Sequence, residues 1–170
     1  MKKGFTIVEL LIVIVIIGIL AAITIVAYNG IQDRARQSKI DSDLSNIATA
    51  IKSAQALTGK TMNGITGNGN IGGTCTSKAA GTDLASLSKT TDTCWTAYLD
   101  ALDKISVAGD TNIRNLVDPW NRPYYLDGNE GEMGYGGGCV KDQIAAYAMP
   151  FAGTTRTNLQ NLPIAVMACP

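Results

Sequence analysis

Residues 5–27 read FTIVELLIVIVIIGILAAITIVA, a stretch that is apolar except for Glu9 and two threonines. At about 1.5 Å per residue, a helix of this length crosses a bilayer core of about 30 Å. Only the letters MKKG precede it, and they include Lys2 and Lys3. Because lysines favour the cytoplasmic side of a membrane helix, this end is predicted to stay in the cytoplasm and the rest of the chain to lie outside.

An apolar N-terminus has two ordinary explanations. A cleaved secretory signal has a shorter apolar core and ends in an Ala-x-Ala step before a polar mature start. Here Ala21-Ala22 is followed by more apolar sequence. A simple single-pass anchor explains the length of the stretch equally well, but it does not explain Glu9.

Glu9 is the informative residue of the stretch. An ionised carboxylate among aliphatic side chains in a membrane costs a few kcal/mol unless it has a partner. No cation lies within the span. A cut after Gly4 would expose the α-ammonium of Phe5 about one helical turn from Glu9, and in staggered neighbouring helices the two charges could pair. The pair would then set the register between subunits.

The N-terminal residues resemble the class III signal and first helix of type IV pilins and pseudopilins. The resemblance rests on Lys2-Lys3-Gly4, on Phe5 to Leu10 and on Gly18 to Ala22, and it continues through Tyr28 and Arg34. It implies that a membrane-embedded prepilin peptidase cuts between Gly4 and Phe5 and methylates Phe5, and that Glu9 acts in assembly. It also implies self-polymerisation and a pilus assembly platform as a partner.

One position departs from this family pattern. Many such pilins carry a proline where this chain has Val26. A proline there helps to bend the helix, so Gly18 and Gly30 are left as the weaker candidates for a bend.

An amphipathic pattern predicts that the helix continues beyond Tyr28 to Gly59, a typical stop signal. The apolar positions recur at three- and four-residue spacing: Ile31, Ala35, Ile40, Leu44, Ile47, Ile51 and Ala54. The opposite, solvent-facing side is predicted to hold Asp33, Arg34, Lys39, Asp41, Asp43 and Lys52.

The remaining sequence predicts a mixed head. Residues 59–81, rich in Gly, Asn and Thr, are predicted to form a surface loop. Thr82-Asp83 could cap a short helix, and a second is predicted from Thr93. Its apolar stripe consists of Trp95, Tyr98, Leu99, Leu102 and Ile105, and we expect the first two to pack in the core.

Four short strands are expected after residue 117, at Tyr124–Leu126, Met133–Val140, Gln143–Met149 and Pro163–Ala168. They predict an α+β fold, with a small antiparallel sheet laid on the long helix, in agreement with the pilin fold. The predicted organisation is a leader at 1–4, a membrane and filament-core segment at 5–28, an amphipathic helix at 29–58 and an extracellular head at 59–170.

The four cysteines are predicted to form two disulfides, which require an oxidising compartment. Three pairings are open. Short loop closure favours Cys75–Cys94 and Cys139–Cys169, each worth about 3 kcal/mol. The second would resemble the C-terminal disulfide loop of many pilins. The chain has no Cys-x-x-Cys pair, so the sequence does not suggest a zinc site.

The composition argues against an enzyme and against a nucleic-acid surface. The chain has no histidine, and no spacing suggests a nucleophile with a base. Its 14 basic and 14 acidic residues balance, and the cations of the head are scattered. We therefore expect a non-enzymatic protein, and DNA binding is only a secondary alternative.

Calcium is the one metal that the sequence suggests. Asp118-Pro119-Trp120 resembles a segment of the major pseudopilins, which bind calcium in a nearby loop. The oxygen ligands that would suit calcium are Asp118, Asp127, Asn129, Glu130 and Glu132. Their spacing is not that of an EF-hand, and the ligand segment of the pseudopilins is missing. A solvated turn without a cofactor is therefore the favoured interpretation.

The predicted function is that of a structural subunit of a type IV pilus. The chain would wait in the inner or cytoplasmic membrane with its N-terminus in the cytoplasm, and then enter an extracellular filament for adhesion, motility or DNA uptake. The alternatives are a major pseudopilin of a type II secretion system and a minor tip pilin that acts as an adhesin or binds DNA. The presence of Glu9 favours a subunit of the filament body.

Overall fold

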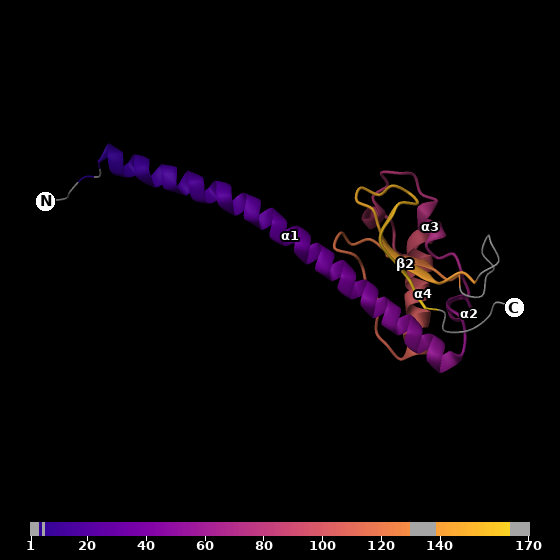
Figure 1. The fold of residues 1–170 in the computed structure, drawn as a ribbon. Helices are drawn as coiled ribbons and strands as arrows, with labels where there is room; N and C mark the ends of the chain where they lie inside the picture. Colours follow the sequence, from indigo (N-terminus) through magenta and orange to yellow (C-terminus); the bar gives the residue numbers. More distant parts are fainter. Residues whose placement is uncertain (1–3, 5, 130–138, 164–170) are drawn as a thin grey trace. The chain divides into compact units, whose positions relative to one another are not determined.

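The computed structural model describes residues 4, 6–129 and 139–163 of the chain. The chain divides into two compact units, Met1–Ser38 and Lys39–Pro170. A single helix, α1 (Ile7–Thr58), begins in the first unit and ends in the second, and neither Gly18 nor Gly30 interrupts it (Figure 1). The predicted long helix is therefore confirmed.

The end of α1 lies where the sequence indicates. Gly59 has a φ of +67°, and its N–H donates to the carbonyl of Gln55 at 2.8 Å. Glycine adopts this left-handed conformation without the steric cost that a side chain would add, so it ends the helix.

The apolar stripe of α1 is buried only from Ile40 onward. Ile40, Leu44, Ile47, Ile51 and Ala54 are between 0% and 4% exposed. By contrast, Ile31 is 65% exposed and Ala35 is exposed as well, so the predicted stripe is correct only within the second unit.

Asp43 corrects the predicted solvent face. Its side chain is buried, accepts a hydrogen bond from the hydroxyl of Tyr124 at 2.7 Å and forms an ion pair with Lys39. Lys39 also donates to the carbonyl of Val117 at 3.0 Å. Asp43 directly precedes Leu44, at the margin of the buried stripe. Its partner Tyr124 comes from a distant segment, which the periodicity of α1 cannot predict.

The predicted loop at 59–81 is wrong in part, because it contains two short helices. They are α2 (Met62–Thr66), which Thr61 caps, and α3 (Gly73–Thr76). Met62 and Ile71 are fully buried, at 0% and 1% exposure. Glycines and asparagines dominate the composition of this segment. For this reason its composition alone did not indicate that Met62 and Ile71 are buried.

The predicted helix at Thr93 is α4 (Thr93–Gly109), and the cap predicted at Asp83 precedes a single 3-10 turn, η1 (Leu84–Ser86). Trp95 and Tyr98 are fully buried, as expected for core residues. The Trp95 ring N–H donates to the Leu84 carbonyl, and the Tyr98 hydroxyl donates to the Leu116 carbonyl, both at 2.7 Å.

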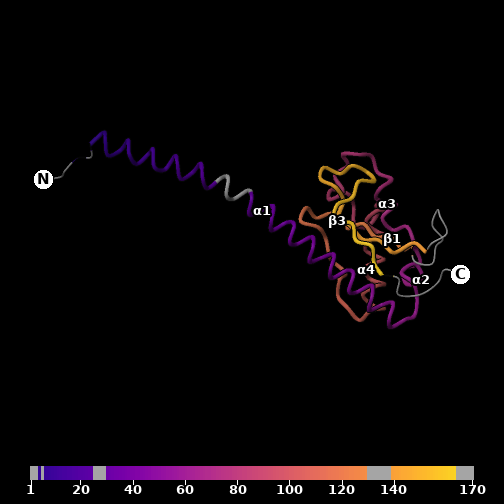
Figure 2. Tube along the Cα trace, viewed as in Figure 1, coloured from indigo at the N-terminus to yellow at the C-terminus, as the bar shows by residue number. Residues whose placement is uncertain are grey.

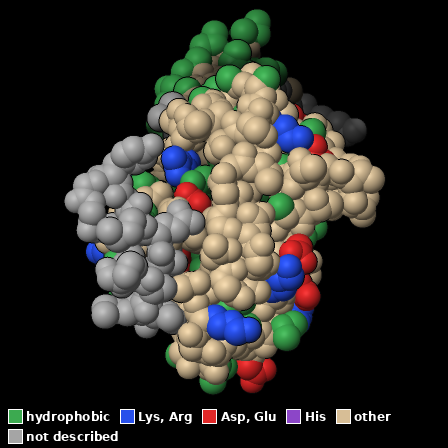
Figure 3. Space-filling model, turned by 90° about the vertical axis from the view of Figure 1, so that its right-hand side faces the viewer, with side chains coloured by type: hydrophobic (Ala, Val, Ile, Leu, Met, Phe, Trp, Pro, Cys, Tyr) green, Lys and Arg blue, Asp and Glu red, His purple; other side chains and the backbone are tan. Residues whose placement is uncertain are grey.

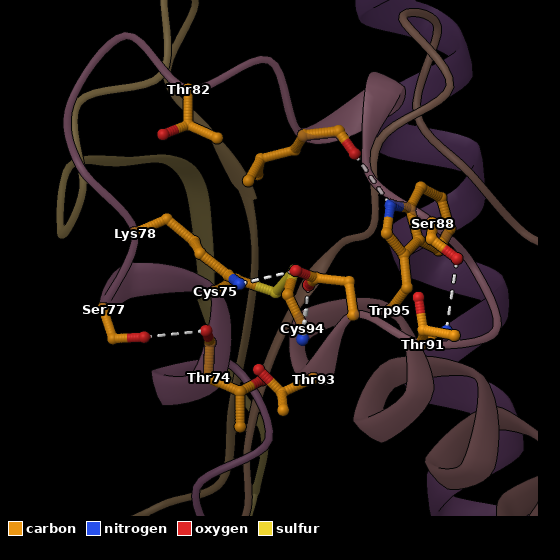
Figure 4. Close-up of polar contacts among 12 residues, drawn as sticks. Thr74, Cys75, Ser77, Lys78, Thr82, Ser88, Thr91, Thr93, Cys94 and Trp95 are labelled. Atoms are coloured by element: carbon orange, nitrogen blue, oxygen red, sulfur yellow. Dashed lines mark hydrogen bonds and ion pairs between the residues drawn. A yellow bond between two sulfur atoms is a disulfide. The ribbon is translucent and has the colours of Figure 1, made fainter.

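The disulfide Cys75–Cys94 is present and joins α3 to the first turn of α4 (Figure 4). Beside it, Asp92 accepts from the Cys94 N–H at 2.9 Å and from the Lys78 ammonium at 2.6 Å. The second predicted pair, Cys139–Cys169, includes Cys169, which lies outside the described residues, so this pair stays a prediction.

The sheet has three antiparallel strands in the order β1-β2-β3: β1 (Tyr125–Asp127), β2 (Gln143–Tyr147) and β3 (Arg156–Asn161) (Figures 1 and 2). The first two confirm predicted strands, whereas β3 was missed. The predicted strand 133–140 falls largely outside the described residues, and so does 163–168 after Pro163. Pro163 and Val140 themselves lie outside the strands.

The described residues of the second unit form two buried apolar clusters, and the larger one packs around the end of α1. It joins the buried residues of α1 from Ile40 onward to α4 and to residues of β1 and β2 such as Leu126 and Ile144. The small antiparallel sheet thus packs against the long helix, which confirms the predicted α+β fold.

Candidate functional site

The first unit exposes an unusually apolar helix surface. Every large aliphatic side chain from Ile7 to Ile23 is at least half exposed, from 50% at Val15 to 86% at Ile7. Among the described residues, one helical segment, Ile7–Thr24, is long and apolar enough to cross a membrane, with a mean hydropathy of 3.0 and no burial within the chain. A helix that is apolar on all sides requires lipid or other apolar helices around it.

The start of α1 is built by Thr6 and Glu9. The Thr6 backbone N–H and the Thr6 hydroxyl both donate to Glu9 Oε2 at 2.8 Å, and the Glu9 N–H donates to the Thr6 hydroxyl oxygen at 3.2 Å. This reciprocal pattern is a capping box, in which a threonine and a glutamate three residues later satisfy each other's free N–H groups.

The capping box bears on the predicted role of Glu9. One carboxylate oxygen is occupied within the chain, while Glu9 Oε1 has no hydrogen-bond partner in the described part of the chain. That oxygen can accept from a further donor without breaking the helix start. Thr6 was missed as a functional candidate, although the Thr-x-x-Glu spacing ahead of an apolar run is a signal for it.

Gly4 lies ahead of α1 in exposed, non-helical backbone, and a Cβ placed on it would meet no atom within 4 Å. Phe5 lies outside the described residues, so the predicted proximity of its amine to Glu9 stays a prediction. Cleavage and methylation at this step also remain predictions.

Asp118, a predicted calcium candidate, is occupied by protein donors. Its carboxylate accepts from the backbone N–H groups of Trp120 and Arg122 at 2.9 and 2.8 Å and from the Arg122 side chain at 2.7 Å. The side chains of Asp118 and Arg122 are 1% and 3% exposed. The Arg122 guanidinium also donates to the carbonyls of Ala148 and Tyr147. Asp118 is thus the partner of a buried arginine rather than the solvated turn residue that the sequence suggested.

Of the other carboxylate candidates for calcium, only Asp127 lies within the described residues, and its partner is Tyr125. Asp127 ends β1 and accepts from the Tyr125 hydroxyl at 2.6 Å, while Glu130 and Glu132 lie outside the described residues. Over the described ranges, no group of three or more Asp, Glu, Cys or His side chains is placed to hold a metal ion.

The charges of the head are mixed. On the face shown in Figure 3, basic and acidic side chains lie near one another among neutral ones. Among the described residues of the head, Lys78 pairs with Asp92 and Arg114 pairs with Asp103. The scattered cations of the sequence therefore do not gather on this face.

Comparison with known proteins finds similarity at the N-terminus of the chain. Residues 1–25 match the family described as the prokaryotic N-terminal methylation motif. The chain is 45% identical over 60 residues to the type IV major fimbrial protein FimA of Dichelobacter nodosus, covering 35% of this chain and 38% of that protein. It is 47% identical over 55 residues to the type IV narrow pilus major component PilA5 of Thermus thermophilus, covering 32% and 44%.

A third relative is the type IV major pilin protein PilA of Myxococcus xanthus, 49% identical over 52 residues, which are 31% of this chain and 24% of that protein. The chain thus matches less than half the length of these relatives. No solved structure matches. The methylation motif at residues 1–25 and the similarity to these major pilins support a relationship of this chain to the type IV pilin superfamily.

Proposed function

We propose that this chain is a structural subunit of a type IV pilus. It is cut after Gly4, methylated at Phe5 and polymerised through α1 into a surface filament. The observation that carries the proposal is the helix surface from Ile7 to Ile23, exposed on all sides and interrupted by a single charge at Glu9. The methylation motif and the relatives named as major pilins support it.

The same surface suits the two environments that a pilin occupies. In the membrane the aliphatic side chains contact lipid, and in a filament they contact the helices of neighbouring subunits. Because both surroundings are apolar, the transfer is nearly neutral in hydrophobic free energy. A specific polar contact can therefore bias the equilibrium toward the filament. Glu9, paired with the Phe5 amine of a neighbour, supplies that contact in this proposal.

The capping box holds Glu9 in the subunit before assembly. Thr6 holds one oxygen of the Glu9 carboxylate, which reduces the cost of the charge before assembly, and leaves Oε1 for the neighbour's ammonium. In this proposal Thr6 is a positioning residue, and Glu9 is the residue that contacts the neighbouring subunit.

Compartment and partners follow from the same proposal. The precursor spans the inner or cytoplasmic membrane at residues 5–28, with leader 1–4 in the cytoplasm. Residues 29–58 and the head at 59–170 lie outside, where the disulfide Cys75–Cys94 is stable. The prepilin peptidase would act on the leader, and an assembly platform would extract the processed subunit.

Processing can be tested with Gly4→Val. We expect this variant to keep its leader, to remain in the membrane fraction and to form no filaments, because the side chain alters the residue just before the cut. Gly30→Ala is the matched control, since a Cβ at Gly30 meets nothing within 4 Å. Precursor size on immunoblots is the readout. Normal processing of Gly4→Val would refute cleavage at this step.

Assembly can be tested with Glu9→Gln, because glutamine preserves a capping box and removes the charge. The ratio of sheared filament to membrane pool should fall about tenfold or more, as expected when an ion pair of more than about 1.4 kcal/mol is lost. Thr6→Val should also reduce assembly, whereas Thr6→Ser keeps the hydroxyl and should preserve it. Filament yields at the wild-type level for Glu9→Gln would contradict the role of the charge.

A further inference from the structure

A polar recess on the head has no role in the proposed assembly through α1. Its volume is about 460 Å³, and it lies where α2, the α2–α3 connection and the end of β1 meet. Its lining residues are Asn63, Asn68, Gly69, Asn70, Asp127 and Asn129. All of them belong to the compact unit that begins at Lys39.

The recess is built by close backbone packing. The Gly128 N–H donates to the Gly69 carbonyl at 2.7 Å, which joins the loop to the end of β1. A Cβ on Gly69 would lie 3.1 Å from the Gly128 carbonyl oxygen and 3.3 Å from Asn63 Nδ2, and a Cβ on Gly128 would lie 3.2 Å from the Asn63 backbone N. Side chains at either glycine would crowd this junction, so the glycines let the amide-bearing segments converge.

Most of the amides that line the recess have no side-chain hydrogen bond to another described residue. Among the described residues, the side chains of Asn63, Asn70 and Asn129 have no hydrogen-bond partner. Asn68 uses its oxygen to accept from the Asn70 N–H at 3.0 Å, and Asp127 accepts from the Tyr125 hydroxyl through one oxygen, Oδ2. Donors and acceptors from three separate segments therefore face one hollow.

The chemistry of these groups selects a class of ligand. Each asparagine offers both an N–H donor and a carbonyl acceptor, which matches hydroxyl groups that also donate and accept. Calcium sites usually include several carboxylates, whereas the described lining residues include one, Asp127, of which one oxygen accepts from Tyr125. Because the described lining residues include one carboxylate and no cation, they disfavour an acidic ligand. We propose that the recess binds a neutral monosaccharide unit through its amides and Asp127.

The described lining residues include no aromatic side chain on which a sugar ring could stack, so the affinity that they provide rests on hydrogen bonds. Removing one amide should therefore weaken binding about fivefold, as expected for one neutral hydrogen bond. The lining side chains are exposed or half-buried, so their truncation should not disturb the fold.

The proposal can be tested by saturation-transfer NMR on the full chain in detergent micelles, which does not depend on filament assembly. The probes are methyl α-mannoside, methyl β-galactoside and N-acetylglucosamine, with methyl glucuronide as the acidic counterpart. We expect transfer to at least one neutral probe and none to the glucuronide. Asn63→Ala and Asn129→Ala should each weaken that binding about fivefold, while Asn112→Ala, an exposed asparagine outside the recess, should leave it unchanged.

Three outcomes would overturn the proposal. The first is the absence of transfer to all neutral probes. The second is transfer that Asn63→Ala and Asn129→Ala leave unaltered, which would place binding elsewhere. The third is calorimetric binding of calcium chloride, abolished by Asp127→Asn, without glycoside binding, which would make the recess a cation site. Because assembly is not a readout, failure here leaves the pilin proposal standing, and the reverse also holds.

Discussion

At the scale of single residues, two buried carboxylates of the head have protein partners. Asp43 and Asp118 were both expected to face solvent, yet both are buried. Asp43 has Tyr124 and Lys39 as partners, and Asp118 has Arg122. Sequence periodicity identifies the apolar residues of a core, but it cannot supply a polar partner that arrives from another segment. For this reason the polar contacts of the head could not be predicted.

The Asp118–Arg122 pair yields a stability prediction. Asp118→Ala leaves the buried Arg122 guanidinium without its counter-charge, so the free energy of unfolding should fall by about 3–5 kcal/mol. Urea unfolding of the full chain in micelles, followed by tryptophan fluorescence, measures it. The exposed pair Arg114–Asp103 provides the control: Asp103→Ala should cost about 1 kcal/mol or less. Equal, small losses in the two variants would contradict a structural role for the buried pair.

At the scale of elements, the success of prediction followed the clarity of the pattern. The long helix and α4 have clear apolar periodicity, and the strand at Gln143 is weakly patterned but rich in apolar residues; all three were predicted. β3 was missed because its sequence, RTNLQN, is polar and its side chains alternate between half-buried and exposed. α2 and α3 were missed because they are only five and four residues long and their buried residues, such as Met62 and Cys75, stand among turn-forming ones. The capping box at Thr6 was readable from its spacing, whereas the amide recess depends on tertiary convergence.

The cap of α4 gives a pH-dependent prediction. The hydrogen bond from Lys78 holds the pKa of Asp92 below its ordinary value, although burial opposes it. A lowered pKa in the folded state adds stability that is fully present above the unfolded pKa of about 3.9 and is lost as the pH falls through the folded value. The stability difference between the wild type and Asp92→Asn should therefore be full at neutral pH and shrink below about pH 4.

Urea midpoints measured at a series of pH values test this expectation. Asp92→Ala should be less stable than Asp92→Asn by about 1 kcal/mol, because asparagine still caps the helix and alanine does not. Asp100→Asn, at the exposed pair with Lys104, is the control and should change little at any pH. A difference between wild type and Asp92→Asn that stays constant with pH would show that the ion pair does not contribute.

The crossing of α4 and α1 gives a second prediction for elements. A Cβ on Gly109 would lie 2.8 Å from the Ala50 carbonyl oxygen, and the Ser53 hydroxyl donates to the Gly109 carbonyl at 2.8 Å. Gly109→Ala must push the helices apart and should cost about 1–3 kcal/mol in urea unfolding. Gly64→Ala is the matched control, because its Cβ would meet neighbours at an ordinary 3.4 Å. Equal stability of the two variants would contradict close helix packing at Gly109.

At the scale of the whole molecule, the two units have different surfaces. Residues 7–24 expose aliphatic side chains on all sides and bury none within the chain, while the unit from Lys39 has its own core and a disulfide. The similarity to known major pilins covers about a third of the chain. This division suits a subunit whose helix enters a common filament core and whose head presents an individual surface.

The central claim is that this chain, cut after Gly4, forms the body of a filament. Mass spectrometry of the N-terminal peptide from filaments sheared off cells tests it most directly. The account predicts an abundant peptide that begins at methylated Phe5, in amounts that match the bulk of the filament protein. A peptide present only in trace amounts would instead indicate a tip subunit. Chain found solely in membranes, with Met1–Gly4 still attached, would contradict the claim.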